Sequence, residues 1–164
     1  MELRVEQVPT PASYALRQAV LRPHQGIVEM AWEGDDQPGT ATFAAVDSAG
    51  SVLGVATVLP QPAPFDPLEA GVRSGAGSKE ATWRLRGMAT RRDLQGQGIG
   101  SKVIAAVVDH VAGQGGDLIW CNARVGAIAF YNKAGFENWG DEFVLPNVGP
   151  HVVMWRLVEP RRAP

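Results

Sequence analysis

The sequence predicts an α/β (α+β) fold with a mixed central sheet. Segments with alternating or continuous apolar residues, which are typical of strands, alternate along the chain with segments whose apolar residues recur at helical spacing. The predicted order is βα(α)βββαβαββ, without an internal repeat or a low-complexity tract. A chain of 164 residues is long enough to bury a proper core. We expect residues 1–160 to form a single domain and residues 161–164 a short tail.

The first half of the chain is expected to supply one strand, one or two helices and a strand hairpin. Thr10 fits a helix N-cap and Pro11 the first helical position. Pro23 ends that helix, because the residue before a proline is disfavoured in the helical region. Asp47-Ser48-Ala49-Gly50 is a hairpin signal between two strands. The expected elements are a strand at residues 3–8, a helix at 10–22, a short second helix within 24–32, and strands at 42–46 and 52–59.

An irregular stretch follows at residues 60–79 and contains four prolines. Connections of this length inside a compact domain are usually functional or disordered. A domain boundary is a third alternative, although the residues before it are too few for a stable core. The sequence leaves open whether this loop borders a substrate entrance or is a solvated excursion.

The second half is expected to alternate between strands and helices. A glycine cluster at residues 113–116 stops a helix that begins near Gly100. Gly135 fits the C-terminal cap of the next helix, and Phe136 is the apolar residue that accompanies such a cap. The expected elements are strands at 83–90, 117–122, 142–145 and 151–157, and helices at 99–112 and 125–134.

The run Gln95-Gly96-Gln97-Gly98-Ile99-Gly100 lies between a predicted strand and a predicted helix. A glycine turn that opens a helix exposes backbone N–H groups without an intrahelical partner, and the helix dipole adds partial positive charge there. Such a turn suits a phosphate or pyrophosphate. The spacing is neither the GxGxxG of a dinucleotide fold nor a P-loop. The alternative is a glycine-rich helix start that holds no ligand.

Composition excludes several other classes. The formal net charge is −2, so the chain lacks the excess of basic residues that is typical of nucleic-acid-binding proteins. Residues 1–6 lack an apolar leader region, and no apolar run reaches membrane-spanning length. Cys121 is the single cysteine and so has no partner for an internal disulfide. Its apolar neighbours in Leu118-Ile119-Trp120-Cys121 favour the interpretation that it is a buried structural thiol rather than a reactive one. We therefore expect a cytoplasmic protein that binds neither membranes nor nucleic acid.

Two motifs in the expected order resemble the GNAT superfamily of acyl-CoA-dependent N-acyltransferases. Gln95-x-x-Gly98-x-Gly100 is similar to the Q/R-x-x-G-x-G/A signature, and residues 127–136, AIAFYNKAGF, are similar to the A-x-x-x-Y-x-K-x-G-F segment. The resemblance is firm from residue 83 to 136 and plausible for the last two strands. It implies a mostly antiparallel sheet of about six to seven strands flanked by about four helices. It also implies acetyl-CoA as co-substrate and no metal.

The resemblance implies a binding site for acyl-CoA. In the family, backbone N–H groups of the glycine turn hold the pyrophosphate, and the pantetheine arm lies along the preceding strand. The positions that carry over are Met88, Ala89 and Thr90 on the strand, and Gln95, Gly96, Gln97, Gly98, Ile99, Gly100 and Ser101 in the turn.

Tyr131 takes the position of the family's general acid. Aminolysis of a thioester expels a thiolate, and a phenol near the sulfur protonates that leaving group. The alternative is a tyrosine that packs the helix onto the sheet. The family often has an asparagine seven residues before this tyrosine. In this chain that position is Arg124, and the nearest asparagine on that side, Asn122, lies two residues before Arg124. A cofactor contact from that stretch is therefore left open.

The base that takes the proton of the amine is less clear from the sequence. The strand at 83–90 carries Arg84 and Arg86 where some relatives have glutamate. Glu142 and His151, which flank the last connection, are candidates for the catalytic base, as is Glu29. Gly149-Pro150-His151 resembles a Pro-His of some bacterial family members. An ordered water is an equal alternative.

The resulting interpretation is an N-acetyltransferase that transfers an acetyl group directly from acetyl-CoA to a primary amine in a ternary complex. The expected acceptor is a small-molecule amine, or an N-terminal or lysine amine. The weak negative charge of the chain is compatible with a cationic acceptor and excludes no class of acceptor. Two alternatives stay open: a GNAT fold that holds CoA as a sensor without turnover, and a nucleotide-binding protein of another fold. A homodimer is also left open.

Overall fold

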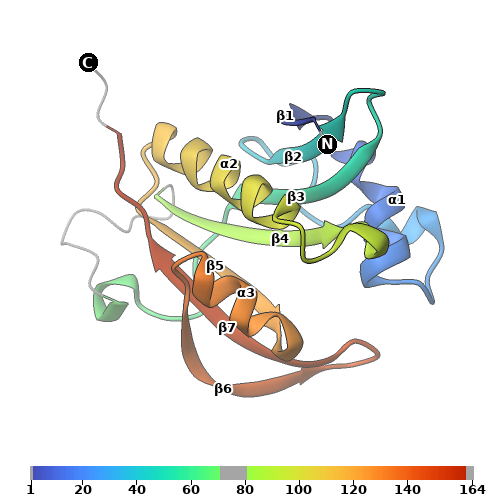
Figure 1. Cartoon of the computed structure of the whole chain (residues 1–164). Coiled ribbons are helices and arrows are strands. Elements are labelled where there is room, and N and C mark those ends of the chain that lie inside the picture. The colour runs from blue at the N-terminus through green and yellow to red at the C-terminus, as the bar shows by residue number, and fades with distance from the viewer. Residues whose placement is uncertain (1, 71–80, 162–164) are drawn as a thin grey trace. The chain divides into compact units, whose positions relative to one another are not determined.

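The strands of the computed structural model form one seven-stranded sheet in the order β1-β2-β3-β4-β5-β7-β6 (Figure 1). The pairs β1–β2, β2–β3, β5–β7 and β6–β7 are antiparallel, and β4–β5 is parallel. This arrangement confirms the prediction of a mixed, mostly antiparallel sheet of six to seven strands. Residues 2–70 and 81–161 contain three α-helices, where about four helices were expected.

The structure describes residues 2–70 and 81–161. It consists of two compact units, and each is described by itself. The first unit comprises Met1–Leu59 and Leu85–Val107, and the second comprises Pro60–Arg84 and Val108–Pro164. Strand β4 (Thr82–Thr90) and helix α2 (Ile99–Gly113) each run through both units.

A three-stranded antiparallel arrangement begins the first unit. Strand β1 pairs with β2 from Leu3 opposite Asp47 to Val8 opposite Thr42. The predicted hairpin joins the next two strands: Gly50 has a φ of +81°, and the Asp47 carboxylate accepts hydrogen bonds from backbone N–H groups within the turn. The bounds are Leu3–Val8 for β1, Ala41–Asp47 for β2 and Val52–Pro60 for β3.

The helix expected at residues 10–22 forms, but it is built from three kinds of turn. A 3-10 turn, Thr10–Ser13, leads into helix α1, Tyr14–Leu16, and then into a π-helical segment, Arg17–Leu21. The N-cap is Pro9, so the prediction of Thr10 as the N-cap was wrong by one residue. The Thr10 hydroxyl instead lies 3.0 Å from that of Thr42 on β2. The short second helix is the 3-10 helix Ile27–Met30.

The core of the first unit lies where these turns pack on the strands. Leu16 joins apolar side chains from β2, β3 and β4, including Ala89, which is 3% exposed. The burial of Ala89 fixes the strand that carries Met88 and Thr90 against the rest of the unit. The buried cluster is Leu16, Ala44, Val46, Val55 and Ala89, with Val8, Val20, Leu21 and Val52 packed on it.

Three strands and one helix dominate the second unit (Figure 1). Strands β6 and β7 begin five and two residues earlier than expected, and their register shifts between Trp139 and Phe143. The helix expected at 125–134 is a 3-10 turn, Val125–Ala127, followed by α3. Their bounds are Leu118–Arg124 for β5, Ile128–Lys133 for α3, Glu137–Leu145 for β6 and Gly149–Leu157 for β7.

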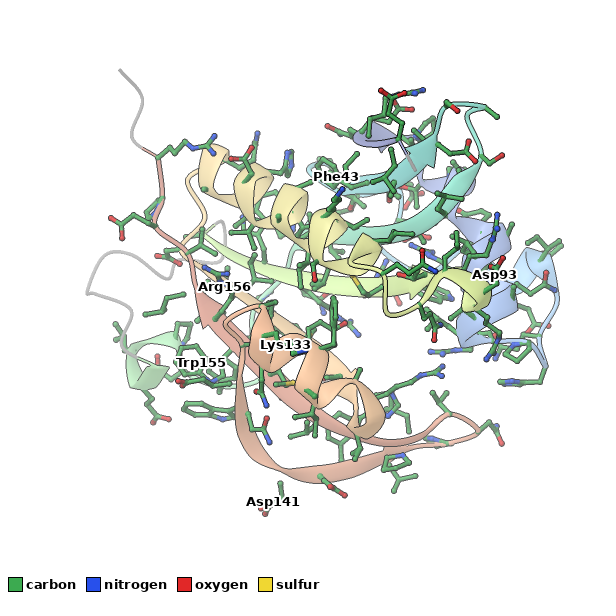
Figure 2. The ribbon with its side chains drawn as sticks, viewed as in Figure 1. Phe43, Asp93, Lys133, Asp141, Trp155 and Arg156 are labelled. Atoms are coloured by element: carbon green, nitrogen blue, oxygen red, sulfur yellow. The ribbon has the colours of Figure 1, made fainter. Side chains whose placement is uncertain are left out.

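The two faces of β7 are covered differently. On one face, Trp155 packs with Phe65 and Trp139. On the other, the Arg156 guanidinium donates a hydrogen bond of 2.9 Å to the carbonyl of Ala134, the C-cap residue of helix α3 (Figure 2). Phe65 stacks on Trp139 with ring centroids 4.4 Å apart. The first part of the predicted 60–79 loop therefore covers an aromatic face and ends in the 3-10 helix Pro67–Ala70. Residues 71–79 of that loop lie outside the described residues.

Candidate active site

The glycine turn of the first unit has the backbone form that its sequence predicts. Gly96 and Gly98 have φ values of +81° and +84°, a region that favours glycine. Both are exposed, and a Cβ built on either would meet no atom within 4 Å. Open space therefore lies beside the backbone at both positions, where a phosphate oxygen would need to approach.

Helix α2 starts directly after this turn. Lys102 N–H donates to the Gly98 carbonyl at 3.2 Å, which makes it the first bond of the helical ladder. The N–H groups of Gly100 and Ser101 precede that bond, so a bound anion can accept from them. The helix has 15 residues, which is long enough for its dipole to contribute at this end.

Not every predicted cofactor position can contribute a side chain. Ile99 is 2% exposed, and its Cγ2 atom lies 2.9 Å from where a Cβ on Gly54 would be. Ala89 belongs to the core cluster. At these two positions only the backbone is available to a ligand, whereas Gln95 and Gln97 are exposed. The Gln95 side chain donates to the carbonyl of Thr90 at 3.2 Å.

Tyr131 lies in the second unit on α3 and is 7% exposed. Its ring packs edge-on against Phe130 and Phe136, with centroid distances of 5.2 and 5.4 Å. Phe136 N–H donates to the Tyr131 carbonyl at 2.9 Å, and Gly135 has a φ of +89°, so the predicted helix cap is confirmed. Burial, with Cys121 nearby, raises the pKa of Tyr131 well above its usual value. The phenol therefore carries its proton at neutral pH.

His151 and Glu142 have different environments in the second unit. His151 is 3% exposed and sits on β7 opposite Arg124 of β5 and Phe143 of β6. Its Nδ1 lies 2.8 Å from the Gly149 carbonyl, which only accepts, so Nδ1 carries a proton and donates it to that carbonyl. Glu142 is exposed on β6 at the register shift. Either can accept a proton, but the structure does not join them in a hydrogen bond.

The first unit also contains a charged cluster that the sequence did not predict. The Arg17 side chain is completely buried, and its Nη1 donates to the Asp35 carboxylate at 2.7 Å. Arg86 Nη2 donates to the same carboxylate at 2.9 Å and to the Glu33 carbonyl at 2.6 Å. Burial tends to raise the pKa of Asp35, but hydrogen bonds from Arg17, the Trp32 N–H and Arg86 bring it below its usual value. Asp35 is therefore ionised at neutral pH.

Cys121 is a buried structural thiol. It lies on β5 and is 2% exposed. Burial raises the pKa of Cys121 to about 12, so the side chain stays in the unreactive thiol form at neutral pH. Within residues 2–70 and 81–161, no three His, Cys, Asp or Glu side chains gather in a group that could hold a metal ion. The helices of that same part of the chain are too short or too polar to cross a membrane.

The mixed sheet, with a glycine turn at the start of the long helix α2, defines an α/β protein. The sequence profile of the acetyltransferase (GNAT) family matches residues 7–136. The chain belongs to this family, as the two motifs indicated.

One curated relative agrees with this assignment, and solved structures share the fold. The chain is 29% identical over 160 residues to the uncharacterized N-acetyltransferase YitI of Bacillus subtilis strain 168, covering 98% of this chain and 99% of that protein. Among solved structures, it is similar to the ribosomal-protein-S18-alanine N-acetyltransferase of Escherichia coli, with a TM-score of 0.69, 16% identity and coverage of 99% and 97%. An aminoglycoside 6'-N-acetyltransferase complexed with coenzyme A gives a TM-score of 0.70 at 16% identity, with coverage of 98% and 99%.

Proposed function

We propose that this protein transfers an acetyl group from acetyl-CoA to a primary amine by direct attack in a ternary complex. The observation that carries the proposal is the glycine turn, in which two exposed glycines with positive φ lead directly into the N-terminus of helix α2. Family membership supports an acyl-CoA ligand for that turn. We also propose that residues 1–160 act as one transferase domain, and that it works in the cytoplasm.

The binding of acetyl-CoA would use mainly backbone groups. The pyrophosphate would accept hydrogen bonds from the turn and from Gly100 and Ser101 at the start of α2. The pantetheine arm would then extend back along β4 past Thr90 and Ala89 to Met88. A backbone site of this kind explains why Ile99 and Ala89 can bury their side chains in the core and still contribute to the site.

The transfer itself needs one acid and one base. The amine nitrogen attacks the thioester carbonyl carbon and forms a C–N bond, and the C–S bond then breaks. The departing thiolate takes the phenol proton of Tyr131, and the proton lost from the amine goes to Glu142, His151 Nε2 or a water. The Tyr131 phenol carries a proton at neutral pH, and burial raises its pKa further. The products are an amide and free CoA.

A panel of primary amines assayed for CoA release, together with calorimetric titration of CoA, tests the proposal. We expect micromolar to millimolar binding of CoA and release of CoA with at least one class of amine. Binding of CoA without turnover over the whole panel would indicate a sensor. Tighter binding of ATP or NAD than of CoA would contradict the assignment of the glycine turn.

A further inference from the structure

A buried ion-pair cluster holds strand β4 just before the residues that we assign to the thioester end of acetyl-CoA. The Asp35 carboxylate accepts hydrogen bonds from Arg17 at 2.7 and 3.2 Å and from Arg86 of β4 at 2.9 Å. Arg86 also donates to the Glu33 carbonyl at 2.6 Å. Both bonds of Arg86 end on the segment at residues 33–35, so β4 is tied to that segment at Arg86.

Arg17 connects this segment to the rest of the first unit. Its side chain is 0% exposed, and its guanidinium donates to the Met30 carbonyl at 2.8 Å and to the Thr57 hydroxyl of β3 at 2.9 Å. The Thr57 hydroxyl in turn lies 2.7 Å from that of Thr42 on β2. A continuous set of side-chain hydrogen bonds therefore joins β2, β3 and β4 of this unit.

Gly87, the next residue of β4, packs directly against this cluster. A Cβ at Gly87 would lie 3.1 Å from Arg17 Nε and 3.2 Å from Trp32 Cζ3, so a side chain would fit only if one of them moved. Gly87 has a φ of +65°, a conformation that favours glycine and that changes the direction of the strand's next peptide groups. The close packing on Gly87 therefore fixes the orientation of the Met88 peptide group.

The cluster contains features that do not favour stability. Arg17 begins a π-helical segment, and its buried Nε has no hydrogen-bond partner among residues 2–70 and 81–161. A buried donor without a partner costs free energy, and a buried ion pair is often no more stabilising than apolar residues of the same volume. Stability alone therefore does not account for the cluster. Features of this kind recur at functional sites.

We propose that Arg17, Asp35 and Arg86 are positioning residues for acetyl transfer. They fix the main chain of β4 at Gly87 and Met88, so that a thioester bound along this strand lies where the amine attacks it. The proposal rests on the proposed acetyltransferase function, and it adds residues that act through the main chain of β4. Misplacement of a reacting group by about 1 Å can lower a rate by about 100-fold, so a small shift of β4 is sufficient for a large effect.

Replacement of Arg86 tests this role without breaking the Arg17–Asp35 pair. Arg86→Met removes the bonds between β4 and the segment at residues 33–35. We expect kcat for CoA release to fall about 10- to 100-fold. KM for acetyl-CoA should stay almost unchanged, because the glycine turn is not part of the cluster. Arg86→Lys keeps a charge that can pair with Asp35 and should restore part of kcat.

A matched control and a folding check accompany these variants. Arg4→Gln removes an exposed arginine of β1 that pairs with Glu6, and it should keep the wild-type kcat. Calorimetric titration of CoA into each variant measures the fraction of folded, binding-competent protein. An unchanged kcat in Arg86→Met, or a fall in kcat that only matches a lower folded fraction, would overturn the inference while the transferase function stands.

A double-mutant cycle tests whether Arg86 acts through Asp35. The kcat values of Asp35→Asn, Arg86→Met and the double variant are compared at a temperature at which CoA titration shows all three to be folded. Residues that act as one unit are not additive, so the loss in the double variant should equal that of the more affected single variant. Losses that multiply would show two independent effects and would reject the inference.

A measurement on bound acetyl-CoA decides the inference without turnover. The thioester carbonyl carbon is labelled with ¹³C, and its NMR shift is compared between free and bound acetyl-CoA. We expect a distinct shift in the wild type that moves back toward the free value in Arg86→Met and is unchanged in Arg4→Gln. The same bound shift in the wild type and in Arg86→Met would overturn the inference. Failure of the wild type to bind acetyl-CoA would contradict the proposed function, and this inference with it.

Discussion

The Gln95 side-chain amide donates a hydrogen bond to the backbone carbonyl of Thr90 at 3.2 Å. Thr90 ends strand β4, and Gln95 begins the glycine turn. This bond spans the 3-10 turn Arg92–Leu94 and ties together the two segments that we assign to acyl-CoA. The glutamine of the motif thus has a structural role in the first unit, because its side chain holds the turn against the end of β4.

Gly98→Val should abolish CoA binding. The substitution places a branched side chain in the open space beside the turn, and it also strains a backbone with a φ of +84°. Gly50→Val is a matched control, because Gly50 has a φ of +81° and a Cβ there would likewise meet no atom within 4 Å. Calorimetric titration of CoA into both variants checks the prediction. Unchanged affinity in folded Gly98→Val, or equal losses in both variants, would remove the glycine turn from the site.

Tyr131→Phe should lower turnover by roughly two to four orders of magnitude and leave the binding of acetyl-CoA almost unchanged. The substitution keeps the ring that packs on Phe136 and removes the phenol proton. The other tyrosine of the chain, Tyr14, gives the control Tyr14→Phe, which should retain turnover. Steady-state CoA release and calorimetry measure the two effects. Equal losses of binding and rate in Tyr131→Phe would assign Tyr131 a packing role.

Local signals in the sequence were sufficient for the end of α3 and for the hairpin turn between β2 and β3. Gly135 and Phe136 predicted the end of α3 because positive φ and a following apolar residue are properties of adjacent positions. The start of β6 was missed for the opposite reason: Glu137 and Asn138 are exposed, and an exposed edge strand carries no apolar alternation.

The charged cluster of the first unit was not predictable from spacing. Arg17, Asp35 and Arg86 are far apart along the chain, and only the folded unit joins them. Hydropathy patterns assign an arginine to the surface, whereas Arg17 is buried with its charge paired. The sequence contained only an indirect signal of this cluster, namely that the strand at 83–90 carries arginines where some relatives have glutamate.

Glu142→Gln should raise the KM of the acceptor more than that of acetyl-CoA. Its exposed carboxylate would attract the ammonium of the amine, and added salt should weaken that attraction. Glu137→Gln is the matched control, since Glu137 is also an exposed glutamate of β6. KM values at low and at physiological ionic strength check the prediction. A change in kcat with both KM values constant would make Glu142 a base rather than a binding residue.

Asp35→Asn should lower the free energy of unfolding at pH 7 by roughly 3–5 kcal/mol, because it leaves the buried Arg17 without its counter-charge. The pKa of Asp35 is below its usual value in the folded protein, so the folded state binds its proton less readily than the unfolded state does. The stability that this carboxylate contributes is therefore complete above the unfolded pKa of about 3.9 and is lost as the pH falls through the folded pKa.

The difference between wild type and Asp35→Asn should consequently shrink below about pH 4, where the wild type loses the same charge. Denaturant titrations at pH 7 and at about pH 3 measure both differences. Asp93→Asn is the control: Asp93, labelled in Figure 2, pairs with Arg91 at 2.7 Å, but both side chains are exposed, so little stability should be lost. If the Asp35→Asn difference were constant over this pH range, the ion pair with Arg17 would not be what stabilises the first unit.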